Sequence, residues 1–303
     1  GATECEGAHF DERDQRWDVH VRREGADYHL RPSQLVLATG MSGFPHVPAL
    51  PGQAQFRGQT MHSSEYRSGQ PFAGKRCVVI GSNTSAHDIC ADLWESGATV
   101  TMVQRSPTVV VRSETLAELS WGPLYSEQAV ANGMSTERAD LMGASTPFAL
   151  TPERLIPLNA EIRQRDADLY EGLDSIGFLW DFGEDGTGIG GAYPRRGGGY
   201  YIEVGASAML IEGKIGLRSG VEPIRFDGDA LVLNDGSTLP ADLVVFATGV
   251  WTHEPVGRDA HIPSRREESR PVLGTWLRHQ RRSRSLGRRT AKHVEAYRAR
   301  RSL

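Results

Sequence analysis

Alternating apolar and polar residues predict a short β-meander near the start of the chain. Residues 17–22 (Trp-Asp-Val-His-Val-Arg) alternate as expected of a half-buried strand, residues 24–27 have the composition of a turn, and residues 28–31 match a return strand. The apolar run at 34–40 predicts a buried parallel strand. This run ends in three small residues, Ala38, Thr39 and Gly40.

The same arrangement is predicted a second time after residue 220. Two short strands at 221–226 and 230–233 precede an Asn-Asp-Gly-Ser turn at 234–237, which is a strong hairpin signal. The apolar run at 243–249 then predicts a second buried strand, which ends in Ala247, Thr248 and Gly249. The two Ala-Thr-Gly endings indicate an internal repeat, in which small residues let the chain pass close to a bound cofactor.

A complete strand-helix-strand unit is predicted between these repeats. Residues 77–80 are an apolar strand, residues 84–96 carry one apolar helical stripe that is followed by Gly97, and residues 99–103 predict the next strand. The turn after the first strand departs from G-x-G-x-x-G, because Asn83 and Ala86 replace the second and third glycines. A helix begins at this turn, and its N–H groups would bind a pyrophosphate. The predicted binding residues are Gly81, Ser82, Asn83, Thr84 and Ser85.

Two residues after the second strand favour NADPH over NADH. Arg105 and Ser106 stand where NAD-dependent enzymes place an acid for the ribose hydroxyl and NADP-dependent enzymes place a base for the 2′-phosphate. A solvated surface arginine is the alternative interpretation.

Residues 107–205 predict an insertion with interrupted helices that lines or covers an active site. Its aromatic residues would either shape a substrate pocket or pack the insertion itself. The sequence at 186–191 is a literal G-x-G-x-x-G, but we predict neither a strand before it nor an amphipathic helix after it, and therefore expect a flexible loop. The aromatic residues in question are Phe178, Trp180, Phe182, Tyr193, Tyr200 and Tyr201.

The segment at 56–66 carries a family motif. Phe56, Gly58, His62 and Tyr66 match the pattern F-x-G-x-x-x-H-x-x-x-Y. The segment resembles the fingerprint of the flavin-containing monooxygenases, including their YUCCA-like and Baeyer–Villiger-related members, and the resemblance extends over about residues 1–250.

The resemblance implies an α/β, Rossmann-like flavoprotein fold with two dinucleotide-binding domains, in which an NADPH domain is inserted in an FAD domain. Residues 1–50 would be the last part of the FAD domain, 51–75 a linker with the motif, 76–245 the NADPH domain, and 246–303 the return to the FAD domain. The FAD fingerprint is not found, and the chain begins with Gly, so we expect a piece of a longer protein with a partial FAD domain and poor FAD binding.

The resemblance also implies the activity. NADPH would reduce FAD, and O₂ would supply one oxygen atom to a small organic substrate by N- or S-oxygenation, oxidative decarboxylation or Baeyer–Villiger chemistry, with activity impaired in this chain. His62 would connect the two nucleotide-binding parts rather than transfer protons. No catalytic residue and no metal ligand is predicted, and the oligomeric state is left open.

The composition of the chain disfavours several classes of partner and of enzyme. The chain has 303 residues, with 39% hydrophobic and 24% charged, and its net charge of −4 disfavours nucleic acid as a partner. The three cysteines, Cys5, Cys77 and Cys90, form no redox pair, which disfavours a disulfide-reductase-like flavoenzyme and favours the cytoplasm. No apolar run reaches the roughly 18 residues of a membrane helix. A non-catalytic NADP-binding module stays open.

From residue 255 the composition becomes rich in arginine and loses its apolar periodicity. We expect a disordered basic tail or a stretch that is not native sequence; a nucleic-acid-binding patch is the third interpretation.

Overall fold

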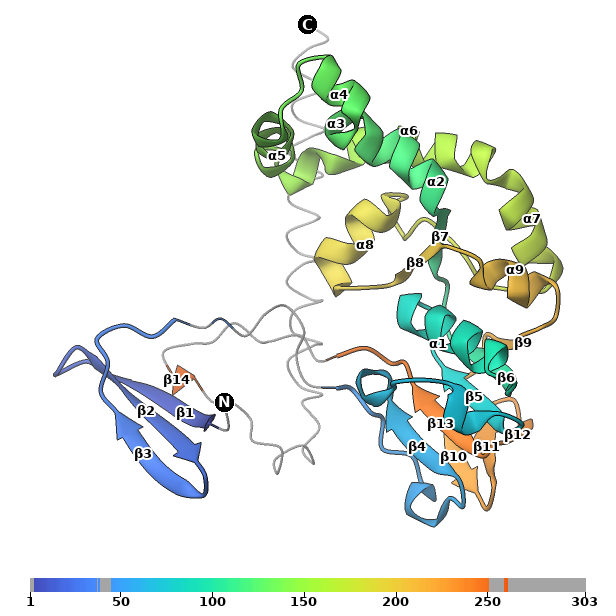
Figure 1. The fold of residues 1–303 in the computed structure, drawn as a ribbon, viewed down its shortest axis with the longest axis horizontal. Coiled ribbons are helices and arrows are strands. Elements are labelled where there is room, and N and C mark those ends of the chain that lie inside the picture. Colours follow the sequence, from blue (N-terminus) through green and yellow to red (C-terminus); the bar gives the residue numbers. More distant parts are fainter. Residues whose placement is uncertain (1–2, 37, 39–44, 251–258, 261–303) are drawn as a thin grey trace, which may run out of the picture. The chain divides into compact units, whose positions relative to one another are not determined.

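The computed structural model describes residues 3–36, 38, 45–250 and 259–260 of the chain (Figure 1). The chain forms two compact units. The meander unit comprises Gly1–Ala38 and Glu254–Leu303, and the parallel-sheet unit comprises Thr39–His253. The predicted domain boundaries at residues 50, 75 and 245 stay predictions. The predicted tail lies almost wholly outside the described residues.

The meander unit confirms the first predicted hairpin. Strands β1 (Thr3–Asp11), β2 (Arg16–Arg23) and β3 (Ala26–Leu30) pair antiparallel in that order, and β14 (Asp259–Ala260) pairs with β1. Ala8 and Val19 are buried on one face of this sheet. The strand predicted at 34–40 is absent from 34–36 and from Ala38, which have no regular secondary structure; residues 37, 39 and 40 lie outside the described part.

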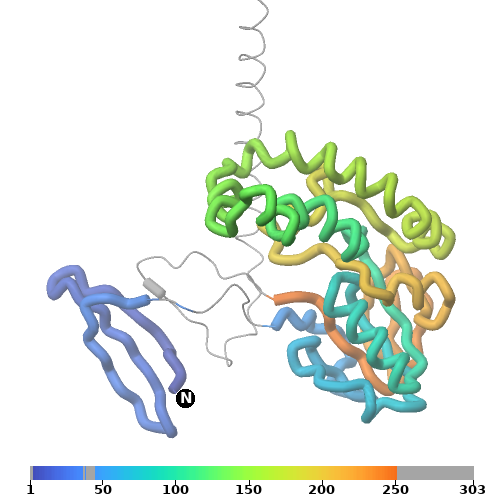
Figure 2. The backbone as a smooth tube through the Cα atoms, turned by 45° about the horizontal axis from the view of Figure 1, so that its top comes forward, coloured from blue at the N-terminus to red at the C-terminus, as the bar shows by residue number. Residues whose placement is uncertain are grey.

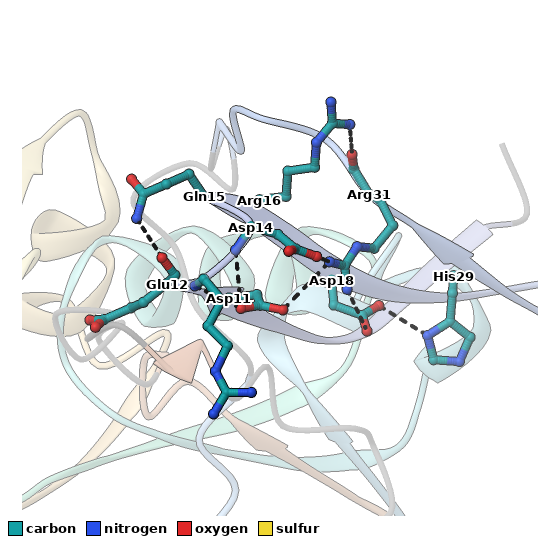
Figure 3. Close-up of polar contacts among 9 residues, drawn as sticks. Asp11, Glu12, Asp14, Gln15, Arg16, Asp18, His29 and Arg31 are labelled. Atoms are coloured by element: carbon teal, nitrogen blue, oxygen red, sulfur yellow. Dashed lines mark hydrogen bonds and ion pairs between the residues drawn. The ribbon is translucent and has the colours of Figure 1, made fainter.

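Charged residues connect the β1–β2 turn to the end of β3 (Figure 3). The carboxylate of Asp11 accepts the N–H of Arg13 at 2.9 Å, and this hydrogen bond lowers the pKa of Asp11. The guanidinium of Arg31 lies 2.7 Å from Asp14, 3.5 Å from Asp11 and 3.7 Å from Asp18. These exposed ion pairs fix the turn locally, and pairs of this kind contribute little to overall stability.

The parallel-sheet unit is built on five parallel strands, in the order β4-β13-β5-β6-β9. The stretch predicted as a linker therefore supplies an edge strand of the sheet, because β4 pairs with β13. The unit also contains the predicted helix, α1. The bounds are β4 (Gln59–His62), β5 (Arg76–Ile80), α1 (Thr84–Glu95), β6 (Thr99–Gln104), β9 (Gly216–Ser219) and β13 (Leu243–Phe246).

Both faces of this sheet are covered, so alternate residues of each strand enter different cores. Cys77 and Val79 of β5 lie in one hydrophobic cluster with α1, while Val78 and Ile80 lie in a second cluster with an antiparallel hairpin sheet. Figure 1 shows α1 lying along β5 and β6. The predicted stripe of α1 is confirmed, since Ala86, Ile89, Cys90 and Leu93 are buried. The hairpin sheet consists of β10 (Pro223–Asp227), β11 (Ala230–Leu233) and β12 (Thr238–Pro240); the first two strands were predicted, and β12 was not.

The predicted insertion is mainly helical and has a small core of its own, around Val109, Val111, Leu116 and Ile162. Figure 2 follows the chain outward through its green helices and back through the yellow one. Two parallel strands, β7 (Val109–Arg112) and β8 (Tyr200–Glu203), frame it. Its helices are α2 (Ser113–Leu116), the π-helix η4 (Ala117–Trp121), α3 (Gly122–Tyr125), α4 (Glu127–Ala131), α5 (Thr136–Ala144), η5 (Phe148–Leu150), α6 (Thr151–Arg165), α7 (Ala167–Ser175) and α8 (Gly188–Arg196).

Four short helices complete the unit. They are the 3₁₀ turns η1 (Gln53–Gln55), η2 (Ser63–Glu65) and η3 (Gln70–Phe72), and the helix α9 (Ala206–Ile211).

The prediction of a flexible loop at 186–191 is wrong, because α8 begins at Gly188. The N–H of Gly188 donates to the carbonyl of Phe182 at 2.7 Å, and the amide of Asn159 on α6 donates to the carbonyl of Gly186 at 2.7 Å. Arg195 of α8 pairs with Asp185, which precedes the helix. These contacts hold the glycine-rich segment in a helix that its local sequence disfavours.

The aromatic residues of the insertion mainly pack it. Phe178 and Tyr201 are buried in the core that includes α1, and the ring of Trp180 stacks on Tyr170 with centroids 4.1 Å apart. Tyr193 is exposed.

Candidate functional site

The turn between β5 and α1 requires glycine at position 81. Gly81 has φ +129°, which side chains rarely adopt, and a Cβ there would lie 2.4 Å from the carbonyl oxygen of Ala247. Its N–H donates to the carbonyl of Val103 at 2.9 Å. Gly81 therefore lets the chain leave β5 while packed against the end of β13.

The N-terminus of α1 presents free donors at this turn. Asn83 is the N-cap residue in extended conformation, but its side chain does not cap the helix. Its carbonyl accepts the N–H groups of Ala86 and His87 at 2.9 and 3.1 Å. Thr84 and Ser85 are exposed, and in the described part of the chain their N–H groups have no acceptor. Unpaired N–H groups and the helix dipole together favour an anion here.

A positive charge lies at the same edge of the sheet. Strands β5 and β6 run parallel with Ile80 opposite Val103, so Gly81 and Arg105 both follow carboxyl ends. Arg105 and Ser106 are exposed, and among the described residues Arg105 forms no ion pair. Ligands of open α/β sheets bind outside the carboxyl ends of the strands. The geometry thus brings together the residues predicted to bind phosphate groups.

Two buried polar side chains, which the sequence analysis missed, hold this edge. Thr108 bonds to Ser82 through its hydroxyl, with 2.8 Å between the two Oγ atoms and 2.9 Å to the Ser82 carbonyl. The amide of Gln104 donates to and accepts from the backbone of Leu179, both at 2.8 Å. A threonine and a glutamine near a strand end give no sequence signal of such a role.

The first half of the family motif packs the segment 56–58 against the hairpin sheet. The ring of Phe56 lies 4.7 Å from that of Phe226 in β10, measured between centroids. A Cβ on Gly58 would lie 2.6 Å from the Phe56 ring and 2.7 Å from the carbonyl oxygen of Asp242. Gly58 therefore allows the ring to fold back over the chain.

His62 connects the end of β4 to the Ala-Thr-Gly segment after β13. Its Nδ1 accepts the backbone N–H of Ser64 at 3.1 Å, so that nitrogen carries no proton. Its Nε2 must then carry the proton, which it donates to the carbonyl of Gly249 at 2.8 Å. His62 is buried and held as the neutral tautomer, with both nitrogens occupied. This arrangement fits a connecting role and leaves no free nitrogen for proton transfer.

Tyr66 connects the motif to α1. Its hydroxyl donates to Asp92 at 2.6 Å, and the same carboxylate oxygen accepts the N–H of Gly69 at 2.7 Å. Burial, together with the Asp92 carboxylate, raises the pKa of Tyr66. The four motif residues therefore tie the segment 56–66 to the hairpin sheet, to β13 and to α1.

The two Ala-Thr-Gly segments differ in what can be described. Ala38 is exposed in the meander unit, while Thr39 and Gly40 lie outside the described residues. Ala247 is buried against Gly81, and the hydroxyl of Thr248 donates to the carbonyl of His46. Gly249 has φ +81°, and its carbonyl also accepts the N–H of His46 at 3.0 Å. These polar groups are used inside the parallel-sheet unit.

Two of the three cysteines are unsuited to redox exchange. All three are free, and Cys77 and Cys90 are buried. Burial raises the pKa of the Cys77 thiol to about 11 and also raises that of Cys90. A thiol of this kind is a poor nucleophile, because the thiolate is the reactive form.

Within the described ranges, Glu6, His20 and Asp27 bring possible metal ligands within 4.8 Å of one another. Arg22 already pairs with both carboxylates, at 2.9 Å from Asp27, so this guanidinium offsets part of their negative charge. No helix in the described part of the chain combines the length and the apolar character needed to cross a membrane.

Comparison with known proteins gives a family model and several similar sequences. The model of the pyridine nucleotide-disulphide oxidoreductase family matches residues 11–143. Indole-3-pyruvate monooxygenase YUCCA1 of Oryza sativa subsp. japonica is 35% identical over 167 residues, which are 52% of this chain and 39% of the relative. Probable indole-3-pyruvate monooxygenase YUCCA10 of Arabidopsis thaliana is 37% identical over 244 residues, or 79% and 55%. The chain spans about half the length of the curated relatives it matches.

Solved structures show the same fold. Cyclohexanone monooxygenase with bound ε-caprolactone has a TM-score of 0.55 at 18% identity, covering 82% of this chain and 54% of that one. The enzyme from Rhodococcus sp. Phi1 bound to NADP⁺ has a TM-score of 0.51 at 19% identity, covering 82% and 51%. The predicted α/β, Rossmann-like flavoprotein fold is confirmed.

Proposed function

The chain belongs to the flavin-containing monooxygenase family, and from this premise we propose that its parallel-sheet unit binds NADPH for a flavin-dependent monooxygenase reaction. The reaction would use NADPH and O₂ to oxygenate a small organic substrate. FAD would be the second cofactor, and the net charge of −4 leads us to expect no nucleic-acid partner.

One observation supports the proposal above all others. Among the described residues, the N–H groups of Thr84 and Ser85 and the guanidinium of Arg105 have no partner, and they lie at the same edge of the sheet. The helix N-terminus fits a diphosphate, and Arg105 with Ser106 fits a 2′-phosphate. Gly81 lets the chain turn from β5 toward α1 while it is packed against Ala247, which brings the helix N-terminus to this edge. The chain's own residues thus bind and orient the coenzyme.

FAD would supply the activation of oxygen, and its fit is weaker. Three groups of the residues predicted near FAD are bonded within the parallel-sheet unit, namely the N–H of Ala247, the hydroxyl of Thr248 and the carbonyl of Gly249. Ala38 is exposed and contributes no described hydrogen bond. We therefore derive no step through FAD. His62 is assigned to hold the motif against Gly249 and not to transfer a proton.

For the substrate we favour a carbonyl compound of the indole-3-pyruvate kind, because the sequence relatives are named for it. Oxidative decarboxylation would then be the reaction type, ahead of N- or S-oxygenation and Baeyer–Villiger oxidation. A cytoplasmic location is part of the same proposal and rests on the three free cysteines.

Two other functions are weighed against this one. A disulfide reductase is named by the matching family model, but the buried Cys77 and Cys90 thiols have raised pKa values and are not paired. A non-catalytic NADP-binding module would have the same nucleotide site, so only activity separates it from the monooxygenase.

Calorimetric titration with NADP⁺ and with NAD⁺ tests the nucleotide site. We expect saturable NADP⁺ binding that Arg105→Ala weakens about tenfold or more, with NAD⁺ binding nearly unchanged, since a charged hydrogen-bonded contact contributes roughly 1.5–3 kcal/mol. Arg225→Ala is the matched control, because Arg225 is an exposed arginine that pairs with Asp227 in the hairpin sheet. Absence of saturable NADP⁺ binding would overturn the proposal.

NADPH oxidation with added FAD then tests the chemistry. Oxygen consumption matched to loss of indole-3-pyruvate supports the monooxygenase and its substrate class. NADP⁺ binding without any oxygen-dependent NADPH oxidation would instead support the non-catalytic module.

A further inference from the structure

Thr108 bonds to both residues of the turn that leads into α1. Its side chain is fully buried. The Ser82 carbonyl can only accept, so the Thr108 hydroxyl donates to it at 2.9 Å, and the Ser82 hydroxyl donates to Thr108 Oγ1 at 2.8 Å. The side-chain oxygen of Asn83, the N-cap residue, lies 3.4 Å from the same hydroxyl. One threonine hydroxyl therefore defines the path of the chain between Gly81 and α1.

The loop that presents Arg105 and Ser106 is fixed at both ends. Before it, Gln104 is buried and its amide bonds to both backbone groups of Leu179. After it, the N–H of Thr108 donates to the Leu179 carbonyl at 3.1 Å. Pro107 restricts the backbone within the loop. Arg105 and Ser106 are thus the exposed part of a short, anchored loop.

We propose that Thr108 is a positioning residue that sets the distance between the turn at 81–85 and the Arg105 loop, and thereby the preference for NADP over NAD. The inference rests on the proposed function, because it assigns the turn to the diphosphate and the loop to the 2′-phosphate. NADP would contact the turn through its diphosphate and the Arg105 loop through its 2′-phosphate. NAD has no 2′-phosphate and would contact only the turn. Loosening the link therefore penalises NADP more than NAD.

Thr108→Val tests the role, since valine keeps the shape and removes the hydroxyl. The variant leaves the buried hydroxyl and carbonyl of Ser82 without their partner. We expect NADP⁺ affinity to fall about tenfold and NAD⁺ affinity to fall about threefold or less, so that the ratio of the two affinities decreases. Thr108→Ser keeps the hydroxyl and should restore the ratio.

A double-mutant cycle separates positioning from simple stabilisation. In an Arg105→Ala background, Thr108→Val should have no further effect on the ratio of NADP⁺ to NAD⁺ affinity, because the group being positioned is gone. Ser82→Ala provides a second variant that removes only the Oγ contact and keeps the bond to the Ser82 carbonyl. Circular dichroism and thermal unfolding show that each variant is folded.

The outcomes are distinguishable. Equal loss of affinity for both nucleotides in Thr108→Val, or a lower melting temperature with an unchanged ratio, would overturn the positioning role while leaving the proposed function in place. The same holds if the effects of Thr108→Val and Arg105→Ala on the ratio simply add. If the wild-type chain binds neither nucleotide, the proposed function fails and this inference fails with it.

Discussion

The parallel sheet and the helical insertion of the same unit are packed very differently. All four residues of β13, Leu243 to Phe246, are fully buried, because layers cover the sheet on both faces. The insertion is built from short helices around a small core, and about half of the surface of many large apolar side chains is exposed. These side chains are Trp121, Tyr125, Val130, Leu141, Met142, Phe148, Leu150 and Ile156.

This difference in packing indicates which part of the unit tolerates substitutions. The candidate site is formed by the ends of the sheet strands and by α1, and its turn is held closely by Ala247 and Thr108. The insertion has more freedom, since many of its side chains face solvent. Equivalent substitutions in the two regions should therefore have unequal effects.

The largest difference is expected between two glycine-to-alanine substitutions. Gly81→Ala would place a Cβ 2.4 Å from the Ala247 carbonyl oxygen at a φ of +129°, so we expect a loss of about 4 kcal/mol and of NADP⁺ binding. Gly143→Ala, inside α5, meets nothing within 4 Å and should stabilise the protein by up to about 1 kcal/mol. Urea unfolding measures both. A stable, nucleotide-binding Gly81→Ala protein would contradict the assignment of the turn.

A leucine pair tests the packing contrast directly. Leu243→Ala removes a fully buried side chain of β13 and should cost about 3 kcal/mol. Leu141→Ala changes a side chain of α5 that is 67% exposed and should alter the free energy of unfolding by less than about 0.5 kcal/mol. Similar losses for the two variants would show that the insertion has a cover that the described residues do not include.

The smallest effect is a pH dependence that comes from α1. His87 is fully buried, its ring stacks on Tyr201 with centroids 3.8 Å apart, and Nδ1 lies 3.2 Å from the Asn83 carbonyl. Within the described residues its Nε2 has no partner. Burial lowers the pKa of His87 to about 4 from its ordinary value of 6.5.

The sign follows from proton uptake. Between pH 6.5 and 4 the unfolded chain binds a proton at His87 that the folded chain does not, so stability falls as the pH falls through this window. We expect a loss of about 2 kcal/mol between pH 7 and pH 5 from this residue. His87→Phe should keep the stacking and remove this part of the slope. Parallel pH curves for the two proteins would rule out the assignment.

Local elements could be predicted from the sequence because their signals are local. The helix α1 needed only its apolar stripe and the following Gly97, and β5 and β6 needed only short apolar runs. The turn at Gly81 and the exposed Arg105 followed from their places after these strands. Their binding of nucleotide stays a prediction.

The remaining features depend on residues far apart in the chain. The helix α8 is held by Asn159 and by the Arg195–Asp185 pair, so its glycine-rich sequence alone predicted a loop. The run predicted as a strand at 243–249 ends at Phe246, because Gly249 turns to meet His46 and His62. Thr108 was missed because its partner, Ser82, is on another element.

The place of β13 has a consequence for biosynthesis. It is the last strand of the parallel sheet along the chain, yet it lies between β4 and β5, which are among the first. His62 and Gly249, which join at the ends of β4 and β13, are 187 positions apart. At ribosomal speed, β4 would wait roughly 10–40 s for its neighbour. During that interval the nascent chain would carry unpaired strand edges, and we expect chaperones to bind it at this stage.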